Sequence, residues 1–263
     1  MKFHVMPRLA MVVGMAGLRM MQAHAAAPPA AVPLGPLPPI SAEVREVLQL
    51  LHDRKDTLKE FTAKIDYSVE DKTGDVTGKQ GTLAFVEDPI KGATFSVLFS
   101  YNTRDGKKTM AYHQEIIFDG KDLTTKDFGT DDKGRLFTRS NMLPPGAKPG
   151  DAVSLNGALP LPIGIDVDDV VRNFDASLLP SKDADKAVLK LVPRTHGKFN
   201  YDSLVVTVDK KKDVQLPLKM VITAPGGDSV TTMVLDDLKI NTGAAKMLDA
   251  KTPASEGWTE RGK

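Results

Sequence analysis

Histidine, the side chain that most often serves in acid–base and metal chemistry, occurs five times in this chain. His4 and His24 lie within the first 25 residues, and His52, His113 and His196 are widely separated in the remainder. No histidine belongs to an HExxH motif or to another close pair, so the spacing gives little support for a metal or acid–base site. We therefore interpret the last three as isolated surface or strand residues.

Carboxylates cluster at two places in the sequence, and both clusters have a structural explanation. Asp166, Asp168 and Asp169 precede a short apolar stripe, where acidic residues suit the N-terminus of a helix. The aspartates within 127–132 occupy a predicted turn and lack the spacing of a calcium-binding loop. We predict no catalytic residue, no metal and no cofactor, and hence no enzyme. A hydrolase with scattered catalytic groups is the alternative.

The composition excludes further classes of function. The 263 residues carry a formal net charge of +1 and are 6% aromatic, which gives neither an electrostatic nor a stacking case for nucleic acid. The chain has no cysteine, so disulfides, thiolate metal sites and cysteine nucleophiles are excluded. A continuous run of about 18 apolar residues, which a membrane-spanning helix needs, does not occur.

The first 25 residues predict a secretory signal peptide. A positively charged start precedes the apolar stretch 9–18, and Ala23-His24-Ala25 fits the small-residue pattern of a cleavage site. We expect a periplasmic mature chain that begins near Ala26. A buried N-terminal helix is the alternative.

Residues 26–40 hold six prolines and are predicted to form an extended linker. The linker is either a plain tether or a ligand for a proline-binding groove. After it, Ser41 can cap a helix whose residues Val44, Val47, Leu48 and Leu51 form one apolar stripe. The stripe is predicted to pack on a sheet, although a membrane-surface helix has a similar pattern.

Beyond residue 60, apolar residues alternate with a period of two, which is typical of half-buried strands. The predicted strands cover 61–69, 81–85, 95–101, 110–118, 123–128, 135–138, 187–192, 204–208, 216–223 and 229–240. Short turns such as Asp119-Gly120 imply antiparallel pairing, and a sheet of so many strands should curl. We predict one α+β domain, 41–263, built on a curved antiparallel sheet.

The segment 141–165 breaks this alternation with prolines and glycines. It is nevertheless rich in apolar residues, namely Leu155, Leu159, Leu161, Ile163 and Ile165. Because exposing so many large apolar side chains is costly, we expect 155–165 to cover an apolar cavity. The alternative is that the segment completes a filled core. A short helix is predicted after Asp166, with an apolar face that includes Phe174.

Several short motifs resemble the LolA-type outer-membrane lipoprotein carriers, the LolA/LolB-like lipoprotein-binding fold. They are F-x-A-x-I-x-Y at 61–67, G-x-L-x-F at 81–85, the hairpin sequence IIFDGKDL at 116–123, and Pro253 followed by Gly257-Trp258. The resemblance spans roughly 41–260 and rests on the order and spacing of these motifs.

The resemblance implies an incomplete, strongly curved antiparallel β-barrel with an N-terminal helix and a helical or irregular lid across its mouth. In that family the interior receives acyl chains of lipoproteins that leave the inner membrane. It implies a monomer that binds lipoprotein acyl chains or phospholipid, takes cargo from an inner-membrane release complex and delivers it to an outer-membrane acceptor. The family places an arginine that helps to hold the lid where this chain has Lys91, and lysine lacks the forked hydrogen bonding of arginine.

The predicted acyl-chain site combines the apolar members of the first three strands with the irregular segment. It comprises Phe61, Ile65, Leu83, Phe85, Phe95, Val97, Phe99, Leu159, Leu161 and Ile163. Alternation places the strand residues on one face, whereas Thr94 and Ser96 are expected to point away and to tolerate a charge. The leading functional hypothesis is a periplasmic carrier. The alternative is a periplasmic lipid-sensing, lipoprotein-sensing or protein-interaction module without transfer activity.

Overall fold

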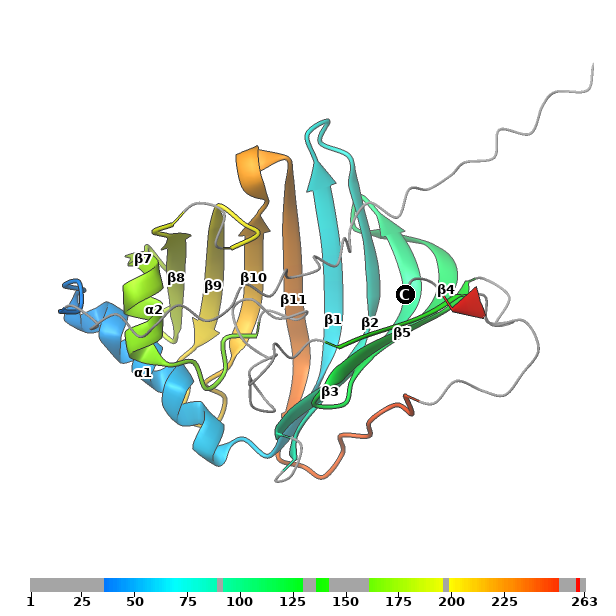
Figure 1. Cartoon of the computed structure of the whole chain (residues 1–263), viewed down its shortest axis with the longest axis horizontal. Helices are drawn as coiled ribbons and strands as arrows, with labels where there is room; N and C mark the ends of the chain where they lie inside the picture. The colour runs from blue at the N-terminus through cyan, green and yellow to red at the C-terminus, as the bar shows by residue number, and fades with distance from the viewer. Residues whose placement is uncertain are drawn as a thin grey trace, which may run out of the picture.

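The computed structural model describes residues 36–88, 92–129, 136–141, 161–195, 199–250 and 259–260. Strands dominate this part of the chain (Figure 1). In chain order the elements are α1 (Ala42–Thr57), β1 (Glu60–Asp71), β2 (Val76–Asp88), β3 (Gly92–Arg104), β4 (Lys107–Phe118), β5 (Asp122–Gly129), β6 (Leu136–Asn141), α2 (Val167–Asn173), β7 (Phe174–Leu179), β8 (Lys186–Pro193), β9 (Ser203–Asp209), β10 (Pro217–Thr223), the 3-10 turn η1 (Pro225–Gly227), β11 (Ser229–Ile240) and β12 (Thr259–Glu260).

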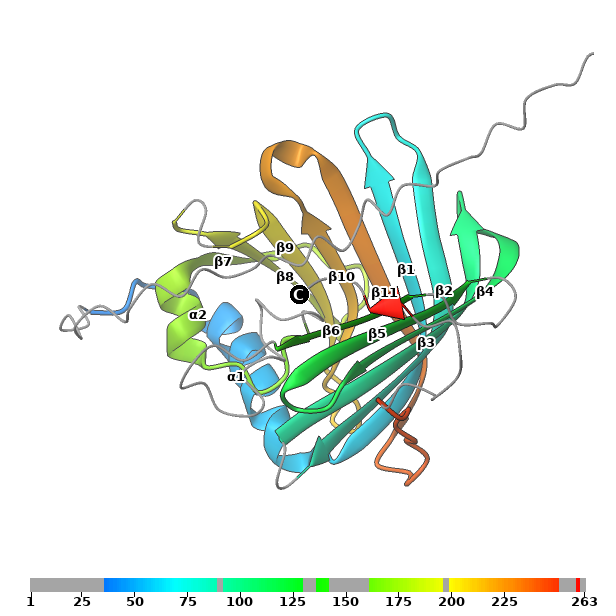
Figure 2. The same ribbon diagram turned by 45° about the vertical axis from the view of Figure 1, so that its right-hand side comes forward.

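All the strands belong to one sheet, in the order β12-β6-β5-β4-β3-β2-β1-β11-β10-β9-β8-β7. Neighbours are antiparallel except for β12, which lies parallel to β6. The sheet bends so that β3 and β5 run across the direction of β9 and β10 (Figure 2). Within the described ranges no pairing joins β7 to β12, so the barrel is incomplete. The predicted α+β fold class is confirmed.

Helix α1 forms where the apolar stripe predicted it. The hydroxyl of Ser41 accepts a hydrogen bond from the N–H of Val44 at 3.3 Å and so caps the first turn. The stripe residues Val44, Val47, Leu48 and Leu51 are buried. They share one hydrophobic cluster with strand side chains, which defines the inner face of the sheet. The stripe therefore packs on the sheet, as predicted.

Helix α2 begins after Asp166, whose carboxylate accepts from the N–H of Asp169 at 2.9 Å. The prediction that Phe174 continues the face of this helix is wrong, because Phe174 adopts extended backbone and begins β7. Its ring lies 4.4 Å from that of Phe199 and 6.4 Å from that of Tyr201, measured between centroids. Tertiary aromatic contacts therefore override the local helical pattern at this residue.

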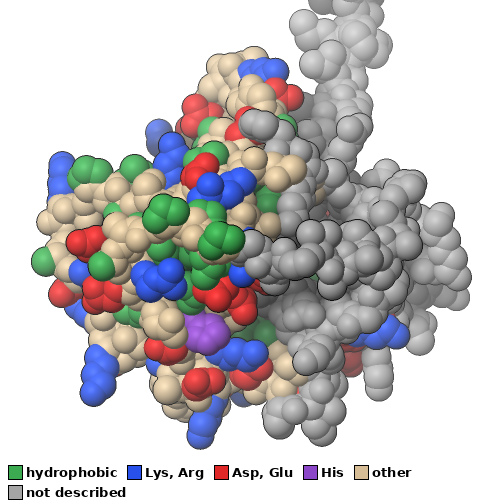
Figure 3. Space-filling model, turned by 60° about the vertical axis from the view of Figure 1, so that its left-hand side comes forward, with side chains coloured by type: hydrophobic (Ala, Val, Ile, Leu, Met, Phe, Trp, Pro, Cys, Tyr) green, Lys and Arg blue, Asp and Glu red, His purple; other side chains and the backbone are tan. Residues whose placement is uncertain are grey.

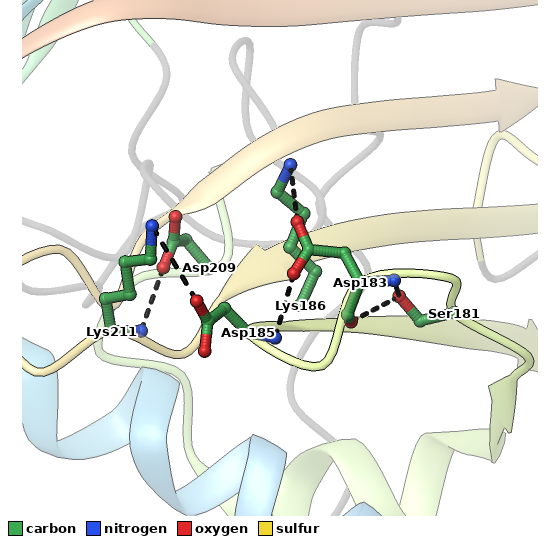
Figure 4. Close-up of polar contacts among 6 residues, drawn as sticks. All are labelled: Ser181, Asp183, Asp185, Lys186, Asp209 and Lys211. Carbon is green, nitrogen blue, oxygen red and sulfur yellow. Dashed lines mark hydrogen bonds and ion pairs between the residues drawn. The ribbon is translucent and has the colours of Figure 1, made fainter.

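Charged side chains join the turn between β7 and β8 to the turn between β9 and β10 (Figure 4). Lys186 pairs with Asp183 at 3.2 Å, and Lys211 reaches Asp185 at 3.7 Å. The carboxylate of Asp209 accepts from the backbone N–H of Lys211 at 2.8 Å. The Lys211–Asp185 pair thus connects the two turns at the surface, whereas the Lys186–Asp183 pair lies within one turn.

The segment 241–250, which follows β11, crosses the outer face of the sheet. The Ser96 hydroxyl accepts from the N–H of Leu248 at 3.3 Å, and Lys126 donates to the carbonyl oxygen of Asp249. Ser96 is consequently 2% exposed and Thr94 6% exposed. Both residues point away from the inner cluster, but both are buried, which argues against the expectation that they tolerate a charge.

Two further observations concern the N-terminal region and the membrane. Leu37 and Ile40, at the end of the predicted linker, are partly buried against the core. The signal peptide lies outside the described residues and stays a prediction, as do the mature start near Ala26 and the domain bounds. None of the helices in the described ranges has the length and apolar character needed to cross a membrane.

Candidate functional site

A row of aromatic residues crosses the inner face from β1 to β5. Register pairs Phe61 with Phe85, Phe85 with Phe95, and Phe95 with Phe118, and the row ends at Leu123. The rings of Phe61 and Phe85 stack with centroids 5.2 Å apart, and those of Phe95 and Phe118 are 5.5 Å apart. Side chains on directly paired residues point to the same face, so register builds a continuous apolar strip.

The seven strand residues of the predicted acyl-chain site all lie on this inner face. Phe61, Ile65, Leu83, Phe85, Phe95, Val97 and Phe99 are each 5% exposed or less and belong to one cluster with α1. Leu161 is fully buried in the same cluster, and Ile163 packs against it, whereas Leu159 lies outside the described residues. The structure therefore brings nine of the ten together, and their role in binding a ligand stays a prediction.

The irregular segment meets α1 through residues 161–165. The N–H of Gly164 donates to the carbonyl of Leu51 at 2.9 Å, and Nδ1 of His52 lies 2.7 Å from the carbonyl oxygen of Ile165. Gly164 has a φ of +67°, and a Cβ atom there would lie 2.8 Å from Cδ of Lys55. A side chain at 164 would therefore be strained by the positive φ and would displace the Lys55 side chain. The described part of the predicted cover packs on the helix, while 155–160 lies outside the described residues.

Sequence reasoning did not include the second half of the sheet in the site, although its residues complete the same inner face. These residues are Leu189 and Leu191 on β8, Leu204, Val206 and Val208 on β9, Met220 on β10, and Met233 and Leu235 on β11. Their period-two pattern was visible in the sequence. The signal that would have joined them to the first half is the pairing of β1 with β11, which no local pattern reveals.

Polar groups appear on the inner face where the rows reach β4 and β5. The Lys79 ammonium donates to Oε1 of Gln114 at 2.8 Å, and the Tyr112 hydroxyl donates to Asp127 at 2.5 Å. Burial lowers the pKa of Lys79, and the negative charge of Asp127 acts in the opposite direction. Burial, with a smaller effect of Asp127, raises the pKa of Tyr112. This group was not predicted from the sequence, because lysine and glutamine in a strand are normally interpreted as solvent-facing residues.

Two grooves flank α1 on the surface. One, of about 270 Å³, is lined by Val47, Leu50 and Leu179 with Glu43 and Lys186 among the charged residues at its walls. The other, of about 490 Å³, runs past Arg45, Glu46 and Gln49. On the face that carries α1, Figure 3 shows hydrophobic side chains interspersed with charged ones. Neither groove includes a residue of the predicted acyl-chain site.

Arg54 fastens the end of α1 to the sheet. It is 5% exposed, and its guanidinium donates to the Thr57 hydroxyl at 3.0 Å and to the Asp213 carbonyl at 3.3 Å. Burial lowers the pKa of Arg54, and Asp213 acts in the opposite direction. These contacts hold the C-terminal end of the helix against the turn between β9 and β10.

The predicted role of the Asp166 cluster is confirmed, because Asp166 caps α2. The predicted turn position of Asp127 is wrong, because Asp127 lies within β5 and accepts from Tyr112, while 130–132 lie outside the described residues. No group of three or more histidine or carboxylate side chains in the described part of the chain could hold a metal ion. That the chain is not an enzyme stays an expectation. Lys91, Pro253, Gly257 and Trp258 lie outside the described residues.

Comparison with known proteins shows remote similarity to several solved structures. No protein-family model and no curated protein matches the sequence. MucB in the MucA/MucB complex of Pseudomonas aeruginosa is 17% identical, with a TM-score of 0.44 over 81% of this chain and 62% of that chain. LprF from Mycobacterium bovis is 13% identical, with a TM-score of 0.40 over 81% of this chain and 99% of that chain.

The LolA superfamily protein NE2245 from Nitrosomonas europaea is 12% identical, with a TM-score of 0.31 over 74% of this chain and 92% of that chain. This chain spans less than two thirds of the length of the MucB chains it matches. Identities and TM-scores this low compare only the general course of the backbone. The incomplete, curved antiparallel sheet with an N-terminal helix, which was expected from the motifs, is present in the chain itself, with α1 and α2 on its inner side.

Proposed function

We propose that this protein is a periplasmic carrier that binds the acyl chains of lipoproteins, or of other lipids, on the inner face of its curved sheet and carries them toward the outer membrane. The observation that supports it is the continuous apolar inner face, which runs from β5 through β1 to β8 and is covered by α1, α2 and residues 161–165. Because the sheet does not close on itself, these covering elements can move aside and a ligand can take their place on the inner face.

The free energy gained by burying the apolar stripe of α1 is comparable to that gained by burying one acyl chain, which favours reversible exchange of the two on the inner face. Burying the four stripe residues of α1 is worth about 6–12 kcal/mol at about 1.5–3 kcal/mol for each side chain. An acyl chain with about 14 methylenes gains about 11 kcal/mol at about 0.8 kcal/mol for each methylene. One chain can therefore offset the displacement of the helix from the inner face.

The attachment of α1 suits a helix that moves about its C-terminal end. The side chain of Asn241 accepts from the N–H groups of Lys59 and Glu60 at 2.8 and 3.1 Å and donates to the carbonyl of Thr57 at 2.9 Å. Arg54 adds its contact with the Asp213 carbonyl. The grooves run along most of the helix, from Ala42 to Asp53, on the N-terminal side of these contacts. We propose that α1 and residues 161–165 form the lid and separate from each other when lipid enters.

Native mass spectrometry of the mature protein, with and without a triacylated lipoprotein, tests this proposal. We expect retained lipid after purification, or uptake of lipoprotein from detergent solution with a defined stoichiometry. A protein that carries no lipid and takes up neither lipoprotein nor fatty acid would overturn it. N-terminal sequencing of material from an envelope fraction tests the location, and a chain that starts at Met1 in the cytoplasm would contradict it.

The second candidate is a periplasmic sensing or interaction module that hands nothing on. The filled inner cluster beneath α1 and the two surface grooves beside it favour this candidate. A transfer assay separates the two. The carrier should deliver lipoprotein from an inner-membrane release complex to an outer-membrane acceptor, whereas the module should bind lipid or a partner without delivery. We propose that the carrier acts as a monomer.

A further inference from the structure

Register across the sheet shows where the apolar inner face stops. The first row, from Phe61 to Leu123, is entirely apolar, and the next runs from Ala63 through Leu83, Val97 and Ile116 to Thr125. The third begins at Ile65 and passes Gly81 and Phe99 to reach Gln114 and Asp127. In the fourth, Tyr67 is paired with Lys79. Polarity therefore rises along the inner face with distance from the first row.

Lys79 is the cation at this boundary, and the described part of the chain offers its ammonium group one hydrogen-bond acceptor. Among the described residues its hydrogen-bond acceptor is Oε1 of Gln114, and no carboxylate lies within ion-pair distance. The Nζ atom lies 4.8 Å from the centroid of the Tyr112 ring and 5.7 Å from that of Phe99. An ammonium has three donors, so two of them have no oxygen acceptor within the described chain, while two ring faces lie nearby. A half-buried cation in this state gains strongly from an added anionic oxygen.

Two neutral donors adjoin the Lys79–Gln114 contact: the amide of Gln114 itself and the hydroxyl of Thr125, which lies diagonally across from Gln114 in the register. The Oγ1 atom of Thr125 is buried and has no hydrogen-bond partner within the described chain, although a buried hydroxyl normally has one. Thr125 pairs with Ile116, one inner-face step from the pairing of Gln114 with Asp127. Gln114 uses its oxygen for Lys79, so its amide N–H groups remain as donors. Asp127 is held by Tyr112 and contributes the opposing charge at the edge of this group.

We infer that Lys79, Gln114 and Thr125 form a subsite for the anionic head of an acyl ligand, with its chain lying along the apolar rows toward Phe61. The inference rests on the proposed function and names its substrate class, an amphiphile whose acyl chain ends in a carboxylate or a phosphate. The ammonium supplies the charge, and the amide and hydroxyl supply directed hydrogen bonds. A neutral acyl ester would fill the apolar rows but leave the cation without its partner.

Fluorescence titration with paired probes tests the subsite. The first pair is cis-parinaric acid and its methyl ester, and the second is a fluorescent phosphatidate and the matching diacylglycerol. Hydrogen bonds to charged groups are worth about 1.5–3 kcal/mol, so we expect the anionic member of the preferred pair to bind about 10- to 100-fold more tightly. The pair that shows this preference identifies the head group as a carboxylate or a phosphate.

Variants then assign the preference to Lys79. Lys79→Gln should reduce the ratio of affinities to about one while the neutral ester binds as it does to wild type, and Lys79→Arg should retain a preference. Lys108→Gln is the matched control, because Lys108 also lies over a ring, 4.1 Å from the centroid of Tyr101, but is exposed. A Lys108 variant should keep the full preference.

Chemical labelling of the wild type provides a measurement that does not depend on the folding of a variant. Acetylation of Lys79 by acetic anhydride should be suppressed by the anionic probe and not by its neutral partner, with Lys108 labelled equally in both. Equal affinities for anionic and neutral probes would overturn the subsite and leave the proposed function standing. Absence of binding by all four probes would instead contradict the proposed function itself.

Discussion

Ser96 lies on the outer face of β3, and its hydroxyl accepts a hydrogen bond from the backbone N–H of Leu248 at 3.3 Å, across 152 positions of sequence. The Met247 sulfur lies 3.8 Å from the same hydroxyl. The Glu60 carboxylate accepts from three successive N–H groups at 243–245 and fixes the start of the crossing segment. The sheet is thus covered on part of its outer face as well as on its inner face.

This contact predicts an asymmetry between two serines on one strand. Ser96→Glu should lower the free energy of unfolding by about 1–3 kcal/mol or more, because it buries an unpaired charge under 247–249. Ser100→Glu, at an exposed position of β3, should change it by less than about 0.5 kcal/mol. Thermal and urea unfolding followed by circular dichroism compare the two. Equal stability of the variants would mean that the segment does not cover the face in solution.

The inner face predicts a larger effect at Leu83, which is 1% exposed. Leu83→Ala should destabilise the fold by about 2–5 kcal/mol, because it leaves a cavity between Ala63 and Val97, its partners in register. A charge at Leu83 or Val97 should abolish lipid loading together with the stable fold. Thr82→Ala, one residue away and exposed, is the control and should unfold like wild type. A stable, loading-competent Leu83→Asp variant would contradict the assigned register.

Alternation of apolar residues was enough to predict the inner face, because a half-buried strand repeats every two residues and one register places Phe61, Leu83 and Phe95 together. The cover over Ser96 could not be predicted, since 241–250 has no periodic pattern and its contacts involve residues more than 100 positions away. β7 was missed because Phe174 continues the spacing of α2. The polar group at Lys79 was missed because strand alternation alone does not separate a solvent-facing lysine from one over aromatic rings.

The turn between β1 and β2 predicts a stability term that depends on pH. The Asp71 carboxylate accepts from the N–H and hydroxyl of Thr73 at 2.8 and 2.6 Å and from the N–H of Asp75 at 3.1 Å. These hydrogen bonds, led by the Thr73 hydroxyl, hold the pKa of Asp71 below its usual value. A carboxylate with a depressed folded-state pKa stabilises above its unfolded pKa, about 3.9, and loses that contribution as pH falls through the folded-state pKa.

Asp71→Asn should therefore have a lower melting temperature than wild type at pH 7, and the difference should shrink as the pH falls below about 4. Melting curves measured between pH 7 and pH 2.5 check this dependence. A difference that stays constant over the whole range would show that the negative charge of Asp71 contributes nothing to the turn.

The contact between α1 and residues 161–165 predicts that a covalent lock blocks loading. A Cβ atom on Gly164 would lie 3.0 Å from Cβ of Lys55, and disulfides span about 3.5–4.5 Å between Cβ atoms, so a shift of about half an ångström accommodates one. The chain has no cysteine of its own, so the double variant Lys55→Cys/Gly164→Cys can form a single intramolecular bridge.

If α1 and 161–165 separate when lipid enters, oxidation should reduce loading to background and dithiothreitol should restore it. The reduced protein is the matched control, because it carries the same substitutions and the same strain at the positive φ of residue 164. Native mass spectrometry of both forms with lipoprotein measures the outcome. Equal loading of the oxidised and reduced forms would show that acyl chains reach the inner face without separating these two elements, and the lid would have to be sought elsewhere.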